Sequence, residues 1–313
     1  MRILLVRLDG IGDAAACVPL VAALREAGHD VGVAVTTRNA GLFDPGAILA
    51  EHVLERIPWP AHGSTPESTR RAEAEIAAQR YDVALIASEE PEAYALAAAI
   101  PERVGFITGW ARPLKTLWVR RRVTRAVSRA QTIGGEPQHE VEVLYRLGAG
   151  LVRETAPPRD AARLRALLAG ETPVPERRGI VLQAGPKWAE TGVMPETQRA
   201  IAASLSPHGL RVVAAPHDAG GVRARLGVEP ETFADLRGWI AALDAAAAVV
   251  TVDTGAAHVA GMLGVPVVDV FPDRDFAHQV RRWRPWAAPS TTFTAAQAGG
   301  APASVIEAAL DAV

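Results

Sequence analysis

The chain has 313 residues, of which 49% are hydrophobic and 22% charged, and its net charge at pH 7 is −2. This length and composition predict two globular domains of ordinary size and exclude a disordered chain. The apolar runs fall well short of the roughly 20 residues that span a bilayer, so no membrane span is expected. The N-terminus lacks a signal-like stretch and Cys17 is the only cysteine, so we expect a cytoplasmic protein without an internal disulfide.

The first half of the chain alternates short β-rich runs with Ala-rich helical patterns. The expected strands are residues 3–7, 31–35 and 83–87, and the expected helices are residues 14–26 and 69–79. Strands that alternate with helices favour a parallel sheet. A further helix is expected from His139 to Leu147, and the Pro/Glu/Arg-rich residues 173–178 are expected to link two domains.

The alternation restarts after this segment. Strands are expected at residues 179–182, 210–214 and directly before Asp253, and helices at residues 195–205 and 240–247. The pattern predicts an α/β protein with two facing Rossmann-like domains, residues 1–172 and 173–313, with the last helix free to pack back on the first domain. The ligand is expected at the carboxyl ends of the strands of both sheets.

The most informative segment is the turn after the strand that ends at Asp253. Thr254, Gly255 and Ala256 open an Ala-rich helix, and their backbone N–H groups lie at its positive end, where a diphosphate binds favourably. The carboxylate of Asp253 and the imidazole of His258 stand beside that turn. The combination predicts a nucleotide-sugar donor site.

The first turn of the chain offers a second candidate site. Gly10, Gly12 and Ala15 satisfy the dinucleotide-binding fingerprint, but Asp9 and Asp13 place negative charge where a pyrophosphate would sit. Asp13 is either a helix cap or a carboxylate base that deprotonates an acceptor hydroxyl. We favour the base over the cap.

Three segments resemble glycosyltransferase family 9, the ADP-heptose:lipopolysaccharide heptosyltransferases. They are residues 7–13 and 18–20 (RLDGIGD and VPL), residues 139–142 (HEVE), and residues 252–260 and 263–267 (VDTGAAHVA and LGVPV). The resemblance implies an inverting, metal-independent bacterial transferase of GT-B type that needs no cofactor. It implies that Asp13 is the base and that Asp253 and His258 hold the sugar. Gly12, in the segment that resembles the family's opening turn, is expected to bind the donor. The Thr254-Gly255 turn would hold the diphosphate.

The loop after the first strand of the second domain departs from the family pattern. Aligned on Pro195, Thr191 stands where the family carries a Lys that offsets the charge of the leaving diphosphate, and Lys187 comes about four residues earlier. We expect Lys187 to replace that cation, the alternative being an exposed loop lysine. Gly185 belongs to the same donor loop, and Asp218 is the candidate for the ribose hydroxyls. The adenine-side contact is assigned to residues 236–238 by position alone.

Residues 110–129 carry seven cations and no acid. The cations are Arg112, Lys115, Arg120, Arg121, Arg122, Arg125 and Arg129. The run is either a solvated basic face or a docking surface for an anionic membrane face or a phosphorylated acceptor. Nucleic acid is not expected as a partner, because the net charge is near zero and no recognition motif accompanies the run. Acceptor contacts are expected from residues 61–68 and 106–115.

The function predicted from these features is transfer of a sugar, heptose from ADP-heptose in first place, to a hydroxyl of a glycan or glycolipid such as lipopolysaccharide core. Two alternatives remain open at this point. One is an NADP-dependent oxidoreductase that uses Gly10, Gly12 and Ala15, with Arg38 in place of the usual ribose-binding acid. The other is a relative that binds a nucleotide sugar or glycan without turnover. No metal site is expected, because the His residues lack ligand spacing.

Overall fold

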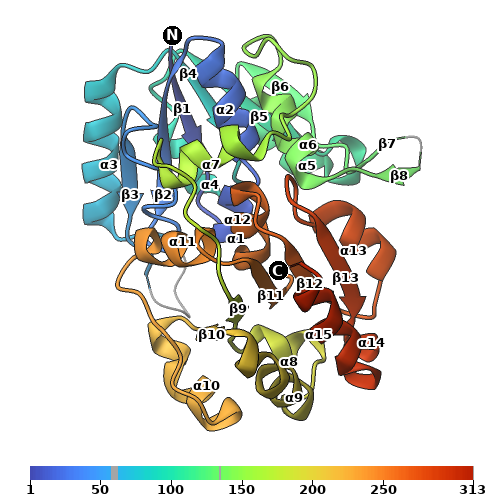
Figure 1. The fold of residues 1–313 in the computed structure, drawn as a ribbon. Coiled ribbons are helices and arrows are strands. Elements are labelled where there is room, and N and C mark those ends of the chain that lie inside the picture. Colours follow the sequence, from blue (N-terminus) through green and yellow to red (C-terminus); the bar gives the residue numbers. More distant parts are fainter. Residues whose placement is uncertain (58–62, 134, 313) are drawn as a thin grey trace. The chain divides into compact units, whose positions relative to one another are not determined.

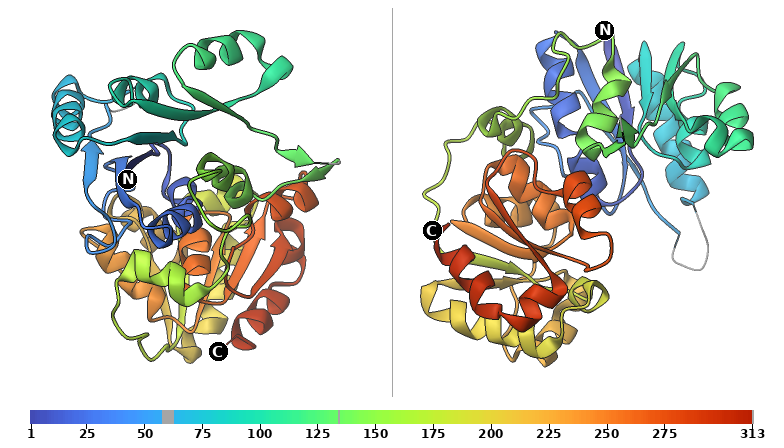
Figure 2. Two further views of the ribbon diagram at one scale, coloured as in Figure 1. Left: turned by 90° about the horizontal axis from the view of Figure 1, so that it is seen from above. Right: turned by 90° about the vertical axis from the view of Figure 1, so that its right-hand side faces the viewer.

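The computed structural model describes residues 1–57, 63–133 and 135–312. Contacts between residues divide the chain into two units, Met1–Pro158 and Arg159–Val313 (Figures 1 and 2).

The first unit is built on a six-stranded sheet whose strands follow the order β3-β2-β1-β4-β5-β6 and pair in parallel throughout. The strands are β1 (Arg2–Val6), β2 (Asp30–Thr36), β3 (Glu51–Leu54), β4 (Val83–Ile86), β5 (Glu102–Ile107) and β6 (Arg125–Ser128). The helices are α1 (Ile11–Ala15), α2 (Val18–Glu26), α3 (Pro66–Gln79), α4 (Pro91–Leu96), the 3-10 turn η1 (Gly109–Ala111), α5 (Pro113–Arg120), α6 (Glu140–Tyr145) and the 3-10 turn η2 (Arg146–Gly148). A small antiparallel pair, β7 (Thr132–Ile133) and β8 (Glu136–Pro137), precedes α6.

Both faces of this sheet are covered, which explains why its central strands are continuous apolar runs rather than alternating ones. Leu4 and Val6 of β1 pack with α3, α4 and α5 in one hydrophobic cluster. Ile3 and Leu5 are equally buried on the opposite face, where α2 packs against β2 and α6.

The second unit is built on a five-stranded parallel sheet with the order β10-β9-β11-β12-β13. The strands are β9 (Ile180–Gln183), β10 (Leu210–Val213), β11 (Ala248–Val252), β12 (Val267–Phe271) and β13 (Ser290–Thr294). The helices are α7 (Ala161–Ala169), α8 (Lys187–Thr191), α9 (Pro195–Leu205), the 3-10 turns η3 (Ser206–His208) and η4 (Pro216–Asp218), α10 (Ala219–Leu226), α11 (Leu236–Asp244), α12 (Gly255–Leu263), α13 (Phe276–Trp283), α14 (Ala295–Gly300) and α15 (Pro302–Leu310). One face packs against α9, α14 and α15, while α7, α11 and α12 pack together beside the other.

The strand orders locate the functional edge of each unit. In open parallel sheets, ligands bind at the carboxyl ends of the strands, where the order reverses direction. That reversal falls between β1 and β4 in the first unit and between β9 and β11 in the second. The loops after these four strands contain Asp13, Lys187 and Asp253 among the predicted site residues.

The boundary between the units falls fourteen residues before the expected domain boundary at 172/173. Helix α7, expected in the first domain, packs against α11 and α12 of the second unit. The expected linker also lies within the second unit, where Arg177 donates hydrogen bonds to the backbone oxygens of Leu263 and Gly264 (2.6 Å each). The last helix, α15, packs on α9 of the same unit.

The helix expected over residues 14–26 is two helices in the structure. Helix α1 ends at Ala15, and α2 begins at Val18 with Pro19 in its first turn, a position where the missing N–H of proline is harmless. Asp13 therefore lies on a separate five-residue helix at the carboxyl end of β1.

Candidate active site

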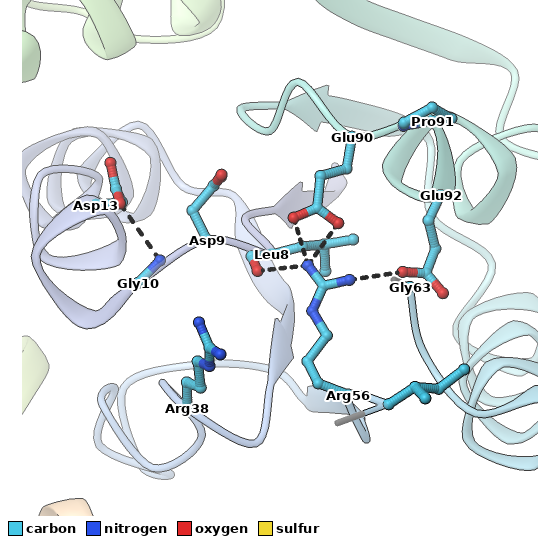
Figure 3. Close-up of a pocket in the computed structure, with 11 residues that line it drawn as sticks. Leu8, Asp9, Gly10, Asp13, Arg38, Arg56, Gly63, Glu90, Pro91 and Glu92 are labelled. Carbon is cyan, nitrogen blue, oxygen red and sulfur yellow. Dashed lines mark hydrogen bonds and ion pairs between the residues drawn. The ribbon is translucent and has the colours of Figure 1, made fainter. Parts of the chain in front are cut away.

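A cavity of about 790 Å³ opens at the carboxyl edge of the first sheet (Figure 3). Its lining comes from the ends of four neighbouring strands, which the parallel sheet brings to one edge. The lining residues are Leu8, Asp9, Gly10, Asp13, Arg38, Arg56, Ile57, Gly63, Glu90, Pro91 and Glu92. The described part of the expected acceptor loop 61–68 contributes Gly63; residues 61 and 62 lie outside the described residues.

Asp13 projects into this cavity with 35% of its side chain exposed. Arg7 Nη2 donates to Asp13 Oδ1 (2.6 Å), and the Gly10 backbone N–H donates to Asp13 Oδ2 (3.3 Å). The carboxylate therefore does cap α1, and the two contacts also fix its orientation. Two oxygens offer about four lone-pair sites, so a carboxylate held in this way retains acceptor capacity for an incoming hydroxyl.

The same geometry argues against dinucleotide binding at the first turn. The Gly10 N–H, which would face a pyrophosphate, already donates to the Asp13 carboxylate. A diphosphate placed there would meet the charges of Asp9 and Asp13 directly. The glycine pattern therefore allows the Asp13 carboxylate to lie close to the backbone at Gly10.

Arg7 is a buried residue that organises the site from beneath. Its guanidinium donates to the Ala87 carbonyl at the end of β4, and Nε lies 3.3 Å from Asp9 Oδ2. Burial raises the pKa of Asp9, while the Arg7 charge opposes that rise and the Asp13 charge adds to it. Two acids thus share one buried cation.

Arg56 is a second arginine of the site, on the opposite wall of the cavity (Figure 3), and we call it and its two glutamate partners the Arg56 clamp. Its Nη2 donates to the Leu8 carbonyl (2.9 Å) and lies 2.5 Å from both Glu90 oxygens, and Nη1 donates to Glu92 (3.1 Å). Arg38 extends toward Asp9 and Gly10 and has no ion-pair partner among the described residues. Such a wall of alternating donors and acceptors suits a hydroxyl-rich ligand.

The loop after β11 opens a helix at the position that its sequence predicts. Thr254 caps α12, since its Oγ1 accepts from the Ala256 N–H (3.3 Å) and also lies 2.9 Å from Thr251 Oγ1. Gly255 is the first residue of α12. The N-terminus of this nine-residue helix therefore lies at the carboxyl edge of the sheet, where its positive end can stabilise an anion.

His258 lies on the first turns of α12 and is nearly buried, with 9% of its side chain exposed. Its Nε2 is 3.6 Å from Asp253 Oδ1, and its ring packs edge-on against Trp283 of α13 (5.6 Å between centroids). The segment 281–286, which the sequence did not assign, thus approaches the donor loop through Trp283. His258 therefore lies beside Asp253, and Asp253 is the more exposed of the two.

Asp269 of β12 is buried beneath this loop, and among the described residues no side chain donates a hydrogen bond to its carboxyl group. Burial raises its pKa well above the ordinary range, and the charge of Asp253 raises it further, opposed only in part by the Val270 backbone N–H. Its surroundings therefore favour the protonated form of Asp269.

We expect Asp269→Asn to stabilise the protein increasingly as the pH rises. A raised folded-state pKa contributes stability below the unfolded value of about 3.9 and loses it as the pH climbs toward the folded value. The asparagine carries no such penalty, so its advantage grows by about 1.4 kcal/mol per pH unit over that range. Urea unfolding of both proteins between pH 5 and 8 measures it. Asp253→Asn should reduce the dependence of this stability difference on pH. A stability difference between Asp269→Asn and the wild type that does not change with pH would show that Asp269 is ionised.

The loop after β9 contains Gly185 and Lys187. A Cβ atom on Gly185 would lie 3.6 Å from Asp218 Oδ2, so the predicted diphosphate and ribose residues are neighbours. Lys187 opens α8 with 51% of its side chain exposed and lies 3.7 Å from Glu190. Thr191, at the position of the family lysine, is buried instead. Lys187 is therefore an accessible cation on this loop, whereas the position of the family lysine is buried.

Several residues of these sites were not predicted, namely Arg7, Arg56, Glu90, Glu92, Trp283 and Asp269. All but Trp283 and Asp269 follow the end of a parallel strand, and that common edge is the signal that could have revealed them. Arg237, within the segment assigned to adenine, donates instead to the Leu168 carbonyl of α7. Among the described residues, no group of three or more His, Cys, Asp or Glu side chains could hold a metal ion.

Two units that are each built on a parallel α/β sheet are typical of the GT-B fold, and solved structures support this fold. The chain is similar to the E. coli heptosyltransferase WaaC with ADP (20% identity, 98% of this chain and 99% of that one, TM-score 0.75) and with ADP-2-deoxy-2-fluoro heptose (19%, 99% and 99%, 0.73). It is also similar to a family 9 glycosyltransferase from Veillonella parvula (18%, 94% and 85%, 0.70). The predicted GT-B fold is confirmed.

Residues 220–312 match the model of glycosyltransferase family 9 (heptosyltransferase). The resemblance that the sequence motifs indicate is thereby confirmed, and glycosyltransferase is the enzyme class that these findings support. No curated protein sequence matches the chain.

Proposed function

We propose that this protein is an inverting glycosyltransferase that moves a sugar, heptose from ADP-heptose in first place, to a hydroxyl of a glycan or glycolipid without a metal ion. The observation that carries the proposal is Asp13. It is a carboxylate fixed by Arg7 and Gly10, and it lines a polar cavity on the sheet edge where ligands of such folds bind.

The division of labour follows from the geometry of the two units. Asp13 would accept the proton of the attacking hydroxyl, and the Arg56 clamp with its carboxylates would hold neighbouring hydroxyls of the acceptor. Asp253, positioned by His258, would orient the donor sugar, and the start of α12 at Thr254 and Gly255 would bind the diphosphate. Gly185 and Asp218 would complete the nucleotide side.

Lys187 is assigned the charge compensation that metal-free transfer requires. A departing nucleoside diphosphate must be stabilised by fixed donors and cations, and each such interaction is worth several kcal/mol in the transition state. With Thr191 buried, the half-exposed Lys187 is the cation on this loop that can turn toward an anionic ligand.

Thermal stability with ADP, UDP, GDP and NADP in the presence of EDTA tests the proposal. A ligand at 100 times its dissociation constant adds about 2.7 kcal/mol of stability, so ADP is expected to raise the Tm by several degrees. Lys187→Gln should weaken this shift, because the ligand loses a cation, whereas Arg199→Gln on α9 should not. Stabilisation by NADP alone would support the oxidoreductase instead. Stabilisation by ADP without transfer of ADP-heptose to any acceptor would leave a non-catalytic binding protein.

A further inference from the structure

The basic run 110–129 separates into two groups in the structure. Four of its cations are used within the first unit. Lys115 binds Glu89, Arg129 binds Glu89 and Glu140, Arg125 binds Glu102, and Arg122 stacks on Trp118 with 3.8 Å from Cζ to the ring centroid. The remaining three, Arg112, Arg120 and Arg121, are exposed and have no ion-pair partner among the described residues.

The same segment exposes three large apolar side chains. Trp110 is 94% exposed, Leu114 82% and Leu117 48%. Leu114 and Leu117 lie three residues apart on α5 and share one side of that helix, and Trp110 lies in η1 directly before it. The opposite side is anchored in the core of the unit by Val119, which is fully buried, and by Trp118.

The three exposed side chains lie outside the core of the unit. An apolar ridge of Trp and Leu would ordinarily be covered, and contiguous exposed apolar surface marks an interaction site. Tryptophan favours the membrane interface, where one part of its ring system is apolar and another meets water. The unpaired arginines beside the ridge add attraction to anionic lipid headgroups.

We propose that residues 109–121 form a docking surface for an anionic phospholipid bilayer, with Trp110, Leu114 and Leu117 inserted among the headgroups and Arg112, Arg120 and Arg121 bound to lipid phosphates. Within the described part of the chain, no helix is long and apolar enough to cross the bilayer, so this contact is an interfacial one. Figure 2 shows α5 at the edge of the first unit beside β6. The proposal concerns binding alone and is independent of the transferred sugar.

Sedimentation of the full chain with lipid vesicles tests the surface. The protein is expected to bind vesicles of phosphatidylcholine with phosphatidylglycerol, to bind phosphatidylcholine alone far more weakly, and to be released at about 1 M salt, where charges are screened within about 3 Å. R112Q/R120Q/R121Q should weaken binding to the anionic vesicles about 100-fold, roughly fivefold per arginine. W110S/L114S/L117S should weaken it at least about tenfold.

Matched controls remove the same charge or apolarity elsewhere. R70Q/R71Q/R80Q takes three exposed arginines from α3 and its C-cap, and V174S/V228S takes two exposed apolar side chains from the second unit. Both should bind as the wild type does. Equal losses in the controls, or no binding by the wild type, would overturn the proposal. A third result would also overturn it. If the wild type self-associates but does not bind vesicles, and W110S/L114S/L117S abolishes the self-association, the surface pairs two copies of the chain.

The assay separates this inference from the proposed function. ADP stabilisation of the docking variants should equal that of the wild type, because none of their substitutions lies in the donor unit. Binding to vesicles but not to ADP would support the docking surface and refute the nucleotide-sugar assignment. Binding to ADP but not to vesicles would support the nucleotide-sugar assignment and refute the docking surface.

Discussion

Asp13→Asn is expected to slow sugar transfer by about 10²- to 10⁴-fold, the range that a positioned general base contributes. The amide cannot take the hydroxyl proton, yet its oxygen can still accept from Arg7 or from the Gly10 N–H. Folding and ADP binding should therefore change little. Steady-state transfer with saturating donor, together with the Tm and the Kd for ADP, measures the separation.

Asp9→Asn is the matched control for this experiment. Asp9 lies next to the same guanidinium and lines the same cavity, so it reports what loss of a neighbouring negative charge does by itself. We expect a much smaller effect on transfer than for Asp13. If Asp9→Asn abolishes transfer and Asp13→Asn preserves it, the base is Asp9 and Asp13 is only the cap of α1.

The second large effect is expected for stability rather than activity. Asp244 is buried at the end of α11, and its carboxylate accepts from Arg165 Nε (3.0 and 2.9 Å) and Nη2 (2.6 Å). Asp244→Ala leaves the buried Arg165 guanidinium without a counter-charge. Breaking a buried pair on one side costs about 3–5 kcal/mol, which we expect as a lower midpoint in urea unfolding of the second unit.

A double replacement shows whether the loss comes from the stranded charge. Replacing a buried pair by apolar residues of similar size is often neutral, so Arg165→Met with Asp244→Leu should recover most of the stability. A double variant as unstable as Asp244→Ala would mean that the hydrogen bonds of Arg165 to the Thr172 and Pro173 carbonyls dominate.

This ion pair also explains why the domain boundary predicted from the sequence differs from the boundary between the two units. Residues 173–178 look like a linker because they are rich in Pro, Glu and Arg, and composition is a sound guide to exposed connections. The contacts that attach α7 to α11 join residues 79 positions apart, however, and no local pattern reveals such a pair.

The parts of the fold that were predicted are those with strong local signals. The helix over residues 195–205 was predicted with its exact bounds, and the central strands were found to within a residue or two, because they are buried on both faces and read as apolar runs. The edge strand β10 was also predicted, but the outer strands β3 and β6 were missed. Strand β6 lies within the basic run, and β3 is a four-residue edge strand with alternate buried positions, so neither has a distinctive pattern.

The candidate site was predicted where chemistry and helix starts coincide. Asp13, Asp253, Thr254 and Gly255 all lie at the carboxyl edges that the motifs indicated. Their partners were not predictable, since Arg7 and Arg56 act through contacts with chain segments up to 80 residues away. The seven cations of the basic run divide by a similar rule, because four of them have partners that only the folded unit supplies.

The position of the boundary also bears on how the chain is made. Each unit is continuous in sequence, and within the described residues α15 remains with the second unit instead of returning to the first. All six strands of the first sheet precede Arg159, so a nascent chain can complete that sheet while the ribosome is still producing the second. The cavity at the edge of the first sheet can therefore form before the loop after β11 has been synthesised.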